Sequence, residues 1–184
     1  MLVVFQLEAY FFTKPAIINI TCWIQPEEGH DGFYDGLNGQ FFTDKNDFCL
    51  YDFHLIEELR PLSRNELFIY FNKLGEIWAE EIERDLLLAF EKYNTVIYLT
   101  HVPPFKEASR YNGAPGEPKA LPFFSCRQAG EAMVRVMEKF PDKKLRVYCG
   151  HTHSEYRLEI GNNIEVNVAK AQYCKPDIFS YIEI

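Results

Sequence analysis

Three histidines that follow apolar segments are the residues of this chain best suited to metal chemistry. His151 and His153 flank Thr152 directly after the apolar run 145–148 and Cys149-Gly150, and His101 comes two residues after the apolar run 96–99. Histidine is the commonest side-chain metal ligand. A polar turn after a strand is the other interpretation of the His-x-His pair, and the elements that carry the three histidines decide between them.

The run 96–99 predicts a strand that is buried on both faces, because it is a continuous stretch of strand-forming apolar residues. Pro103 and Pro104 follow, and two prolines cannot continue a central strand. The chain must therefore leave the sheet just after His101, which places this imidazole at the carboxyl end of the strand.

A helix is predicted between the two histidine segments. Ser125 and Gln128 have the spacing of a capping box, and the chain then carries a helical stripe up to Pro141. The stripe consists of Ala129, Met133, Val136, Met137 and Phe140. Strand, helix and strand in this order predict a crossover between parallel strands, so His101 and His151 should lie at the same edge of the sheet.

The other segments complete an α/β fold. Helical spacing predicts one helix from Asp52 to Pro61 and a long amphipathic helix that ends at Asn94. Its stripe is Leu74, Trp78, Ile82, Leu86 and Phe90. Strands are expected at 2–5, 17–20 and 178–184, with a hairpin at 156–160 and 164–168, so the sheet is mixed or a second sheet packs on the first. Loops are expected at 28–39 and 106–122, and the second is long enough to form a rim or lid.

Composition narrows the class of protein. A chain of 184 residues suits one domain, and a net charge of −8 disfavours a general nucleic-acid binder. Five cysteines without a Cys-x-x-Cys pair suggest neither a disulfide framework nor a thiolate zinc site, and they favour a reducing, cytoplasmic location. Glu8 and Lys14 interrupt the apolar N-terminus, which argues against a membrane span. The aromatic fraction of 16% suggests an exposed apolar surface that associates readily, or a face whose packing partner is missing.

Three imidazoles suit Zn, Fe, Mn or Ni rather than Ca²⁺. Neutral histidines leave the charge of such an ion uncompensated, so a hydrolytic centre also needs carboxylates, and in two-metal sites these bridge the ions. The histidines therefore require acidic partners elsewhere in the chain.

Four segments, in their order along the chain, resemble the calcineurin-like metallophosphoesterases over roughly residues 29–184. They are Asp31-Gly32-Phe33-Tyr34-Asp35-Gly36, Asp52-Phe53-His54-Leu55-Ile56, Thr100-His101-Val102-Pro103-Pro104 and Gly150-His151-Thr152-His153. The resemblance implies an αββα sandwich with mixed sheets and a phosphoester hydrolase with two divalent ions, Mn, Fe, Zn or Ni. It also implies that His101 and His151 are ligands of one metal and that His153 is a ligand of the other.

The chain departs from the family in its first half. Members of the family carry Asp-x-His, Gly-Asp and Gly-Asn-His motifs in their first half. This chain does not contain these motifs in that order. Asp52-Phe53-His54 fits the first by letters, but it lies too late and in a helical context, and Gly29-His30-Asp31 lacks the Asn. His30 is therefore only a candidate for the rim of the site, and Asp31 and Asp35 are not assigned. Cys149 is expected to be a small buried filler.

Two interpretations of this departure remain open. In the favoured one, the chain is a truncated or mispredicted gene product. Residues 1–24 replace or abbreviate the first βαβ portion, residues 25–184 are family-like, and activity is impaired because half of the metal site is missing. In the other, the chain is a divergent member with other metal ligands, completed by a partner chain or in a homo-oligomer. A third hypothesis, from a different class, is a non-catalytic interaction module, which predicts no metal at the three histidines.

Overall fold

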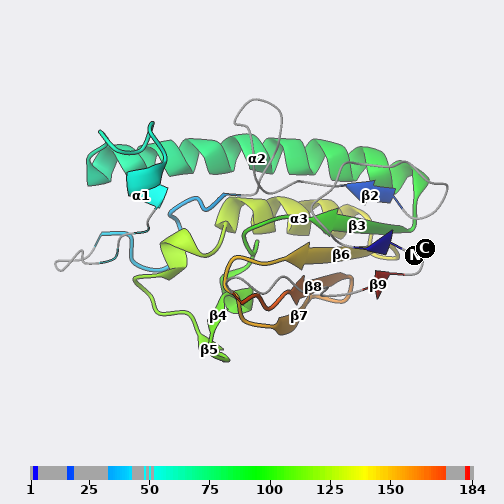
Figure 1. Ribbon diagram of the computed structural model, residues 1–184. Helices are drawn as coiled ribbons and strands as arrows, with labels where there is room; N and C mark the ends of the chain where they lie inside the picture. The colour runs from blue at the N-terminus through cyan, green and yellow to red at the C-terminus, as the bar shows by residue number, and fades with distance from the viewer. Residues whose placement is uncertain are drawn as a thin grey trace.

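The computed structural model describes residues 2–3, 16–18, 33–42, 48, 50, 52–172 and 181–182. These residues form a mixed α/β structure (Figure 1). The strands predicted at 2–5, 17–20 and 178–184 fall only partly within the described residues. The described parts are β1 (Leu2–Val3), β2 (Ala16–Ile18) and β9 (Tyr181–Ile182).

A five-stranded sheet forms the centre of the molecule, with the strand order β2-β3-β6-β8-β7. Its other strands are β3 (Thr95–Leu99), β6 (Lys144–Cys149), β7 (Tyr156–Ile160) and β8 (Ile164–Val168). Neighbouring strands are parallel except for β7, which runs antiparallel to β8 at the edge. The predicted parallel pairing of β3 with β6 and the predicted β7–β8 hairpin are both confirmed. A separate two-stranded pair joins β1 to β9.

Two helices cover one face of this sheet, as Figure 1 shows: α2 (Arg64–Lys92) and α3 (Arg127–Lys139). The main core lies between them and the sheet and takes alternate residues of each central strand, such as Val96 and Tyr98 of β3. Val96, Ile97 and Tyr98 are all buried, which confirms that β3 is covered on both faces.

The helix α2 begins earlier and packs differently from the prediction. Ser63 caps its N-terminus and forms a reciprocal capping box with Glu66. The buried stripe is Leu67, Phe71, Gly75, Ala79, Ile82, Leu86 and Phe90. Leu74 and Trp78 are only half-buried, because strict four-residue spacing drifts around a helix of 3.6 residues per turn.

Two other helix predictions are wrong in detail. The helix predicted from Asp52 to Pro61 is a single turn, α1 (Asp52–Leu55). The capping box predicted at Ser125 is absent, since Cys126 is the N-cap of α3 and makes no side-chain cap. The Ser125 hydroxyl instead donates to the Leu121 carbonyl (2.9 Å) and accepts from Asn38 Nδ2 (2.9 Å). These contacts hold it away from the helix N–H groups.

The two predicted loops differ in character. Residues 33–42 contain neither helix nor strand, and Gly36 and Gly39 adopt positive φ angles of 75° and 72°. The segment 106–122 is more ordered than a plain loop. It contains the 3₁₀ helices η1 (Lys106–Ala108) and η2 (Leu121–Phe123) and a short hairpin of β4 (Arg110–Tyr111) and β5 (Ala114–Pro115).

A second core explains much of the aromatic content. It joins the loop 33–42, α1, the first turns of α2 and η2. Its buried members are Tyr34, Phe41, Phe53, Leu59, Leu67, Phe71, Val102 and Phe123. The Tyr34 and Phe71 rings meet edge to face with centroids 4.7 Å apart. Aromatic residues thus fill an interior beyond the carboxyl end of the sheet.

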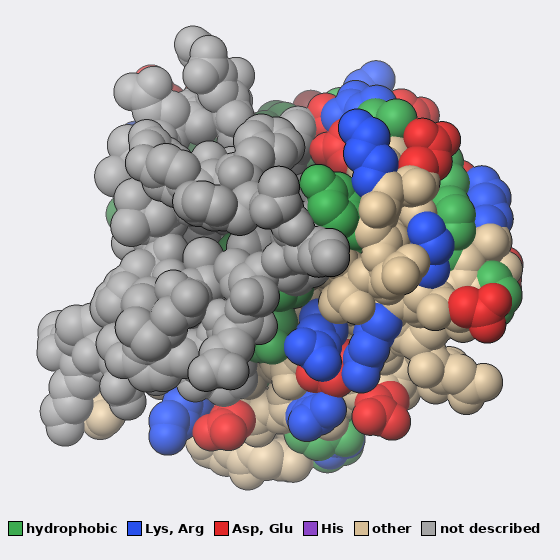
Figure 2. All heavy atoms as spheres, turned by 90° about the vertical axis from the view of Figure 1, so that its right-hand side faces the viewer, with side chains coloured by type: hydrophobic (Ala, Val, Ile, Leu, Met, Phe, Trp, Pro, Cys, Tyr) green, Lys and Arg blue, Asp and Glu red, His purple; other side chains and the backbone are tan. Residues whose placement is uncertain are grey.

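The surface at the opposite end of the sheet carries charges of both signs. Figure 2 shows lysine and arginine side chains interspersed with aspartate and glutamate on this face. In the described part of the chain, each helix is too short or too polar to span a bilayer. The expectation that the chain is no general nucleic-acid binder and the predicted cytoplasmic location stay predictions.

Candidate functional site

The structure brings two of the three predicted histidines into direct contact at the carboxyl ends of β3 and β6. His151 Nδ1 lies 2.9 Å from His101 Nε2. The backbones of the two segments are also joined, because the Gly150 N–H donates to the His101 carbonyl at 2.9 Å. The prediction that His101 and His151 share one edge of the sheet is confirmed.

The backbone around His151 is strained. His151 has a φ angle of 65°, and the Thr152 N–H donates to the Gly150 carbonyl at 2.7 Å across it. A hydrogen bond over three residues with positive φ at the centre defines a classic γ-turn, which is rare. His153 also has a positive φ, 55°. Strained non-glycine residues persist only where the surrounding structure holds them in place. They cluster at functional sites.

Hydrogen bonding fixes the tautomer of His151. Its Nε2 lies 2.9 Å from the carbonyl oxygen of Phe123. A carbonyl can only accept, so Nε2 carries the hydrogen, and Nδ1 of the neutral ring directs its lone pair at His101. Metal-binding histidines commonly donate their second N–H to a backbone carbonyl in this way, which orients the ring.

The surroundings keep His101 neutral. Burial lowers the pKa of His101 to about 3, and the charges of His151 and His153 contribute to the shift. The Phe124 ring lies against His151, with centroids 4.7 Å apart. A neutral imidazole in partly apolar surroundings is the form that binds a metal ion.

The distance between the two histidine nitrogens is compatible with a shared metal ion and with a direct hydrogen bond. Two nitrogens that bind the same ion, each at about 2.0–2.1 Å, lie about 3 Å apart when the nitrogen–metal–nitrogen angle is near 90°. The separation of 2.9 Å between the His101 and His151 nitrogens matches this value, and it also matches a hydrogen bond in which His101 Nε2 donates. The rings as they lie have the geometry of the hydrogen bond, and both would have to turn for their lone pairs to converge on one ion.

The described residues place no further ligand at the pair. His153 is exposed, and the described residues contain no group of three or more His, Cys, Asp or Glu side chains that could hold a metal ion. The structure thus offers two imidazoles for one ion and no described group for a second. His30 and Asp31 lie outside the described residues, and His54 is exposed on α1.

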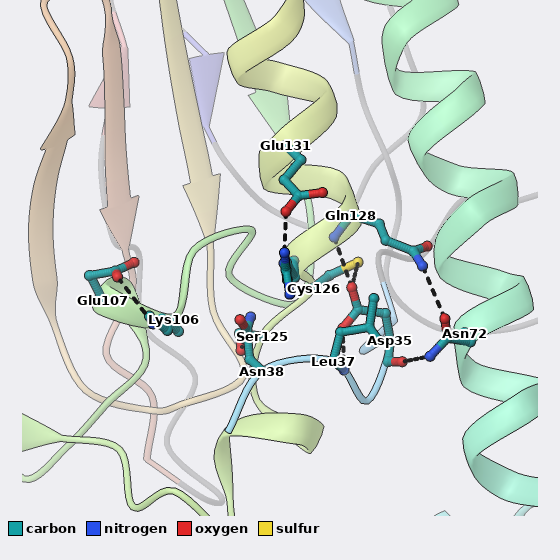
Figure 3. A network of polar contacts seen from close by, with 11 residues as sticks. Asp35, Leu37, Asn38, Asn72, Lys106, Glu107, Ser125, Cys126, Gln128 and Glu131 are labelled. Carbon is teal, nitrogen blue, oxygen red and sulfur yellow. Dashed lines mark hydrogen bonds and ion pairs between the residues drawn. The ribbon is translucent and has the colours of Figure 1, made fainter. Parts of the chain in front are cut away.

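Asp35 is a buried polar residue that sequence reasoning left unassigned (Figure 3). Its Oδ2 accepts from the Gln128 N–H at 2.8 Å, and its Oδ1 accepts from the Leu37 N–H at 3.0 Å. The carboxylate therefore caps α3 from a loop more than ninety positions earlier in the chain. Burial raises the pKa of Asp35, and the hydrogen bonds from Leu37 and Gln128 offset part of the shift.

Asp35 also ties α3 to α2. The Asn72 side chain donates to the Asp35 carbonyl at 3.2 Å and accepts from Gln128 Nε2 at 3.3 Å. Gly75 permits the close approach, because a Cβ there would lie 2.6 Å from the Asp35 Cβ. This network positions α3, so the structure gives Asp35 a structural role rather than a place beside the histidine pair.

Cys149 is buried, and burial raises the pKa of its thiol well above the ordinary range. Its sulfur lies 3.8 Å from the Asn167 carbonyl oxygen. A thiol held neutral in this way is a poor nucleophile. The interpretation of Cys149 as a small buried filler is thereby supported.

Comparison of the chain with models of known protein families, with curated proteins and with solved structures finds no match.

Proposed function

We propose that this chain is a metal-dependent phosphoester hydrolase of the calcineurin-like type, in which His101 and His151 bind a divalent ion. The observation that carries the proposal is the separation of 2.9 Å between His151 Nδ1 and His101 Nε2, with the opposite nitrogen of His151 bonded to the Phe123 carbonyl. A bound ion of this class lowers the pKa of a water ligand and neutralises charge on a phosphoryl group.

The residues of this chain supply binding and orientation. The crossover between β3 and β6 holds both rings at the same edge of the sheet, where open α/β sheets place their ligand sites. The γ-turn and the Phe123 carbonyl fix the orientation of the His151 ring. The mixed sheet with two helices on one face supports the proposed relation to one half of an αββα sandwich.

The described residues contain no group of three or more metal ligands. His101 and His151 would be the protein ligands of one ion. The second ion and the role of His153 rest on the family resemblance alone. Two protein ligands bind an ion more weakly than three or four, so we expect low metal affinity and slow hydrolysis from this chain alone.

Metal analysis of the purified protein tests the proposal. We expect Mn, Fe, Zn or Ni to bind the wild-type chain and to be lost from His151→Ala, with metal-dependent cleavage of an aryl phosphate monoester or diester. His54→Ala is a matched control, because His54 is exposed on α1 and distant in sequence from both strand ends. Equal metal content in wild type and His151→Ala would contradict the ligand assignment and favour the non-catalytic interaction module.

A further inference from the structure

The loop 33–42 supplies neither histidine of the pair, yet it is joined to the segment 118–125, which contacts His151. The Phe123 carbonyl oxygen of this segment lies 2.9 Å from His151 Nε2. The Phe124 ring lies against the imidazole, with centroids 4.7 Å apart. Contacts that hold this segment in place therefore also hold the His151 ring.

Two backbone hydrogen bonds join the loop to the segment. The Gly36 N–H donates to the Pro122 carbonyl at 3.1 Å. The Gln40 N–H donates to the Pro118 carbonyl at 2.7 Å. Because Pro122 immediately precedes Phe123, the first of these bonds acts one residue away from the carbonyl that accepts from the imidazole.

Buried side chains reinforce this attachment. Asn38 is 7% exposed, and its Nδ2 donates to the Ser125 hydroxyl at 2.9 Å (Figure 3). The same hydroxyl donates to the Leu121 carbonyl, also at 2.9 Å. The fully buried Tyr34 ring meets the Phe123 ring edge to face, with centroids 5.7 Å apart. Removing Asn38 would leave a buried hydroxyl without its donor, which is unfavourable.

Gly39 permits the close approach of the loop to the segment. It has a φ of 72°, and a β-carbon there would lie 2.2 Å from the Pro118 carbonyl oxygen. A side chain at this position must therefore push the loop and the segment apart. Gly113 has a similar φ of 80°, but a β-carbon there would meet no atom within 4 Å. The two glycines share a backbone conformation and differ in the close approach.

We infer that the loop 33–42 positions His151 through the segment 118–125, and that Asn38 and Gly39 are positioning residues of the histidine pair. By holding the carbonyl against Nε2, the loop keeps the Nδ1 lone pair directed at the second histidine. Residues that support a ligand in this way determine how well it is oriented for a metal ion. The consequence for metal binding rests on the proposed function, whereas the effect on the imidazole does not.

Proton NMR of the metal-free protein tests the inference through the Nε2–H of His151. This proton is protected from exchange with water while it donates to a carbonyl, and its signal is assigned by its loss in His151→Ala. We expect exchange to be about tenfold faster in Gly39→Ala and faster than wild type in Asn38→Ala, with amide exchange in β6 and β8 unchanged. Gly113→Ala should exchange as the wild type does, because it has the same strain at positive φ without the close contact.

Two variants keep the test decisive. If circular dichroism shows that Gly39→Ala does not fold, Asn38→Ala, which only removes atoms, provides the measurement. The inference is overturned if the Nε2–H is unprotected in the wild type or equally protected in both loop variants. It is also overturned if Gly113→Ala accelerates exchange as much as Gly39→Ala, since the effect would then be a general loss of stability.

Metal analysis of the same proteins separates this inference from the proposed function. A protected Nε2–H that only the loop variants lose, in a chain that binds no metal, would contradict the proposed hydrolase and leave the inference intact. Metal binding that both loop variants keep at wild-type affinity, with the Nε2–H still protected, would support the hydrolase and overturn the inference.

Discussion

At the scale of single residues, the backbone of His151 is the least expected feature of the candidate site. A β-carbon at positive φ clashes with the neighbouring carbonyl, which costs about 1–2 kcal/mol. His151 nevertheless holds a φ of 65° and closes a γ-turn between Gly150 and Thr152. Glycine would adopt this conformation without strain. A histidine at position 151 therefore provides an imidazole at a cost in folding stability.

This argument predicts the order of stability of two variants. His151→Gly and His151→Ala both remove the imidazole, but only His151→Ala keeps a β-carbon at positive φ. We expect His151→Gly to be more stable than His151→Ala by about 1 kcal/mol, measured by urea denaturation.

Glu155 provides the matched control for this comparison. It is exposed in the same loop and does not have a positive φ. There glycine gains no relief of strain and only increases the entropy of the unfolded chain, so Glu155→Ala should be at least as stable as Glu155→Gly. The strain argument fails if alanine is also the better residue at position 151.

The sequence was sufficient to predict that His101 and His151 lie at the same edge of the sheet, but it did not predict the direct contact between their rings. Pro103 and Pro104 fixed the end of one strand, and the βαβ pattern fixed the direction of the other. No local pattern predicted the positive φ of His151 or its bond to the Phe123 carbonyl. The carbonyl belongs to the last residue of a 3₁₀ helix that begins within the segment 106–122, whose sequence indicated only a loop.

At the scale of elements, the two helix starts show why a capping pattern alone is ambiguous. Ser63 and Glu66 form the reciprocal box because Ser63 is exposed and has no competing partner of its own in the described region. Ser125 has the same spacing to Gln128, but its buried hydroxyl is taken by Asn38 and the Leu121 carbonyl. The α3 donors turn to Asp35 instead, and no sequence pattern connects positions so far apart.

The cap of α3 by Asp35 can be tested by truncation. Asp35→Ala removes the acceptor for the Gln128 and Leu37 N–H groups and leaves both without their partner. We expect the free energy of unfolding to fall by about 2 kcal/mol. Hydrogen exchange at the Gln128 amide should accelerate more than exchange in β6.

Asp142→Ala serves as the control, because Asp142 is exposed beyond the other end of α3. Its effect on the free energy of unfolding should stay within about 0.5 kcal/mol. An Asp35→Ala variant that unfolds like the wild type, with unchanged exchange at Gln128, would show that the cap does not stabilise α3.

At the scale of the whole molecule, the sheet was easier to predict than what surrounds it. Apolar runs and turn residues located β3, β6, β7 and β8, because buried strands leave a strong local pattern. The position of β8 between β6 and β7 was not predicted, since strand order depends on long-range pairing. The second aromatic core was also missed, because its residues come from loops and short helices without a regular period.

Glu165 connects three strands of this sheet. It lies on β8 and forms ion pairs with Arg157 of β7 (2.9 Å) and Lys144 of β6 (3.3 Å). Burial alone would raise its pKa, but hydrogen bonds from Asn167 and Lys144 and the charge of Arg157 outweigh burial and lower the pKa below 4.5. The Glu165 side chain is 9% exposed, whereas both cationic partners are largely in solvent, which weakens the pairs.

The lowered pKa of Glu165 predicts how the stability of the molecule depends on pH. A carboxyl group with a lower pKa in the folded state stabilises fully above its unfolded pKa of 4.5 and loses that contribution as pH falls through the folded pKa. At neutral pH, Glu165→Gln should be less stable than the wild type by about 1 kcal/mol. Urea denaturation at successive pH values down to about 3 should show this difference shrinking, while Glu159→Gln, on an exposed position of β7, has little effect at any pH. A difference that grows with acidity would mean that the ionised form of Glu165 does not stabilise the sheet.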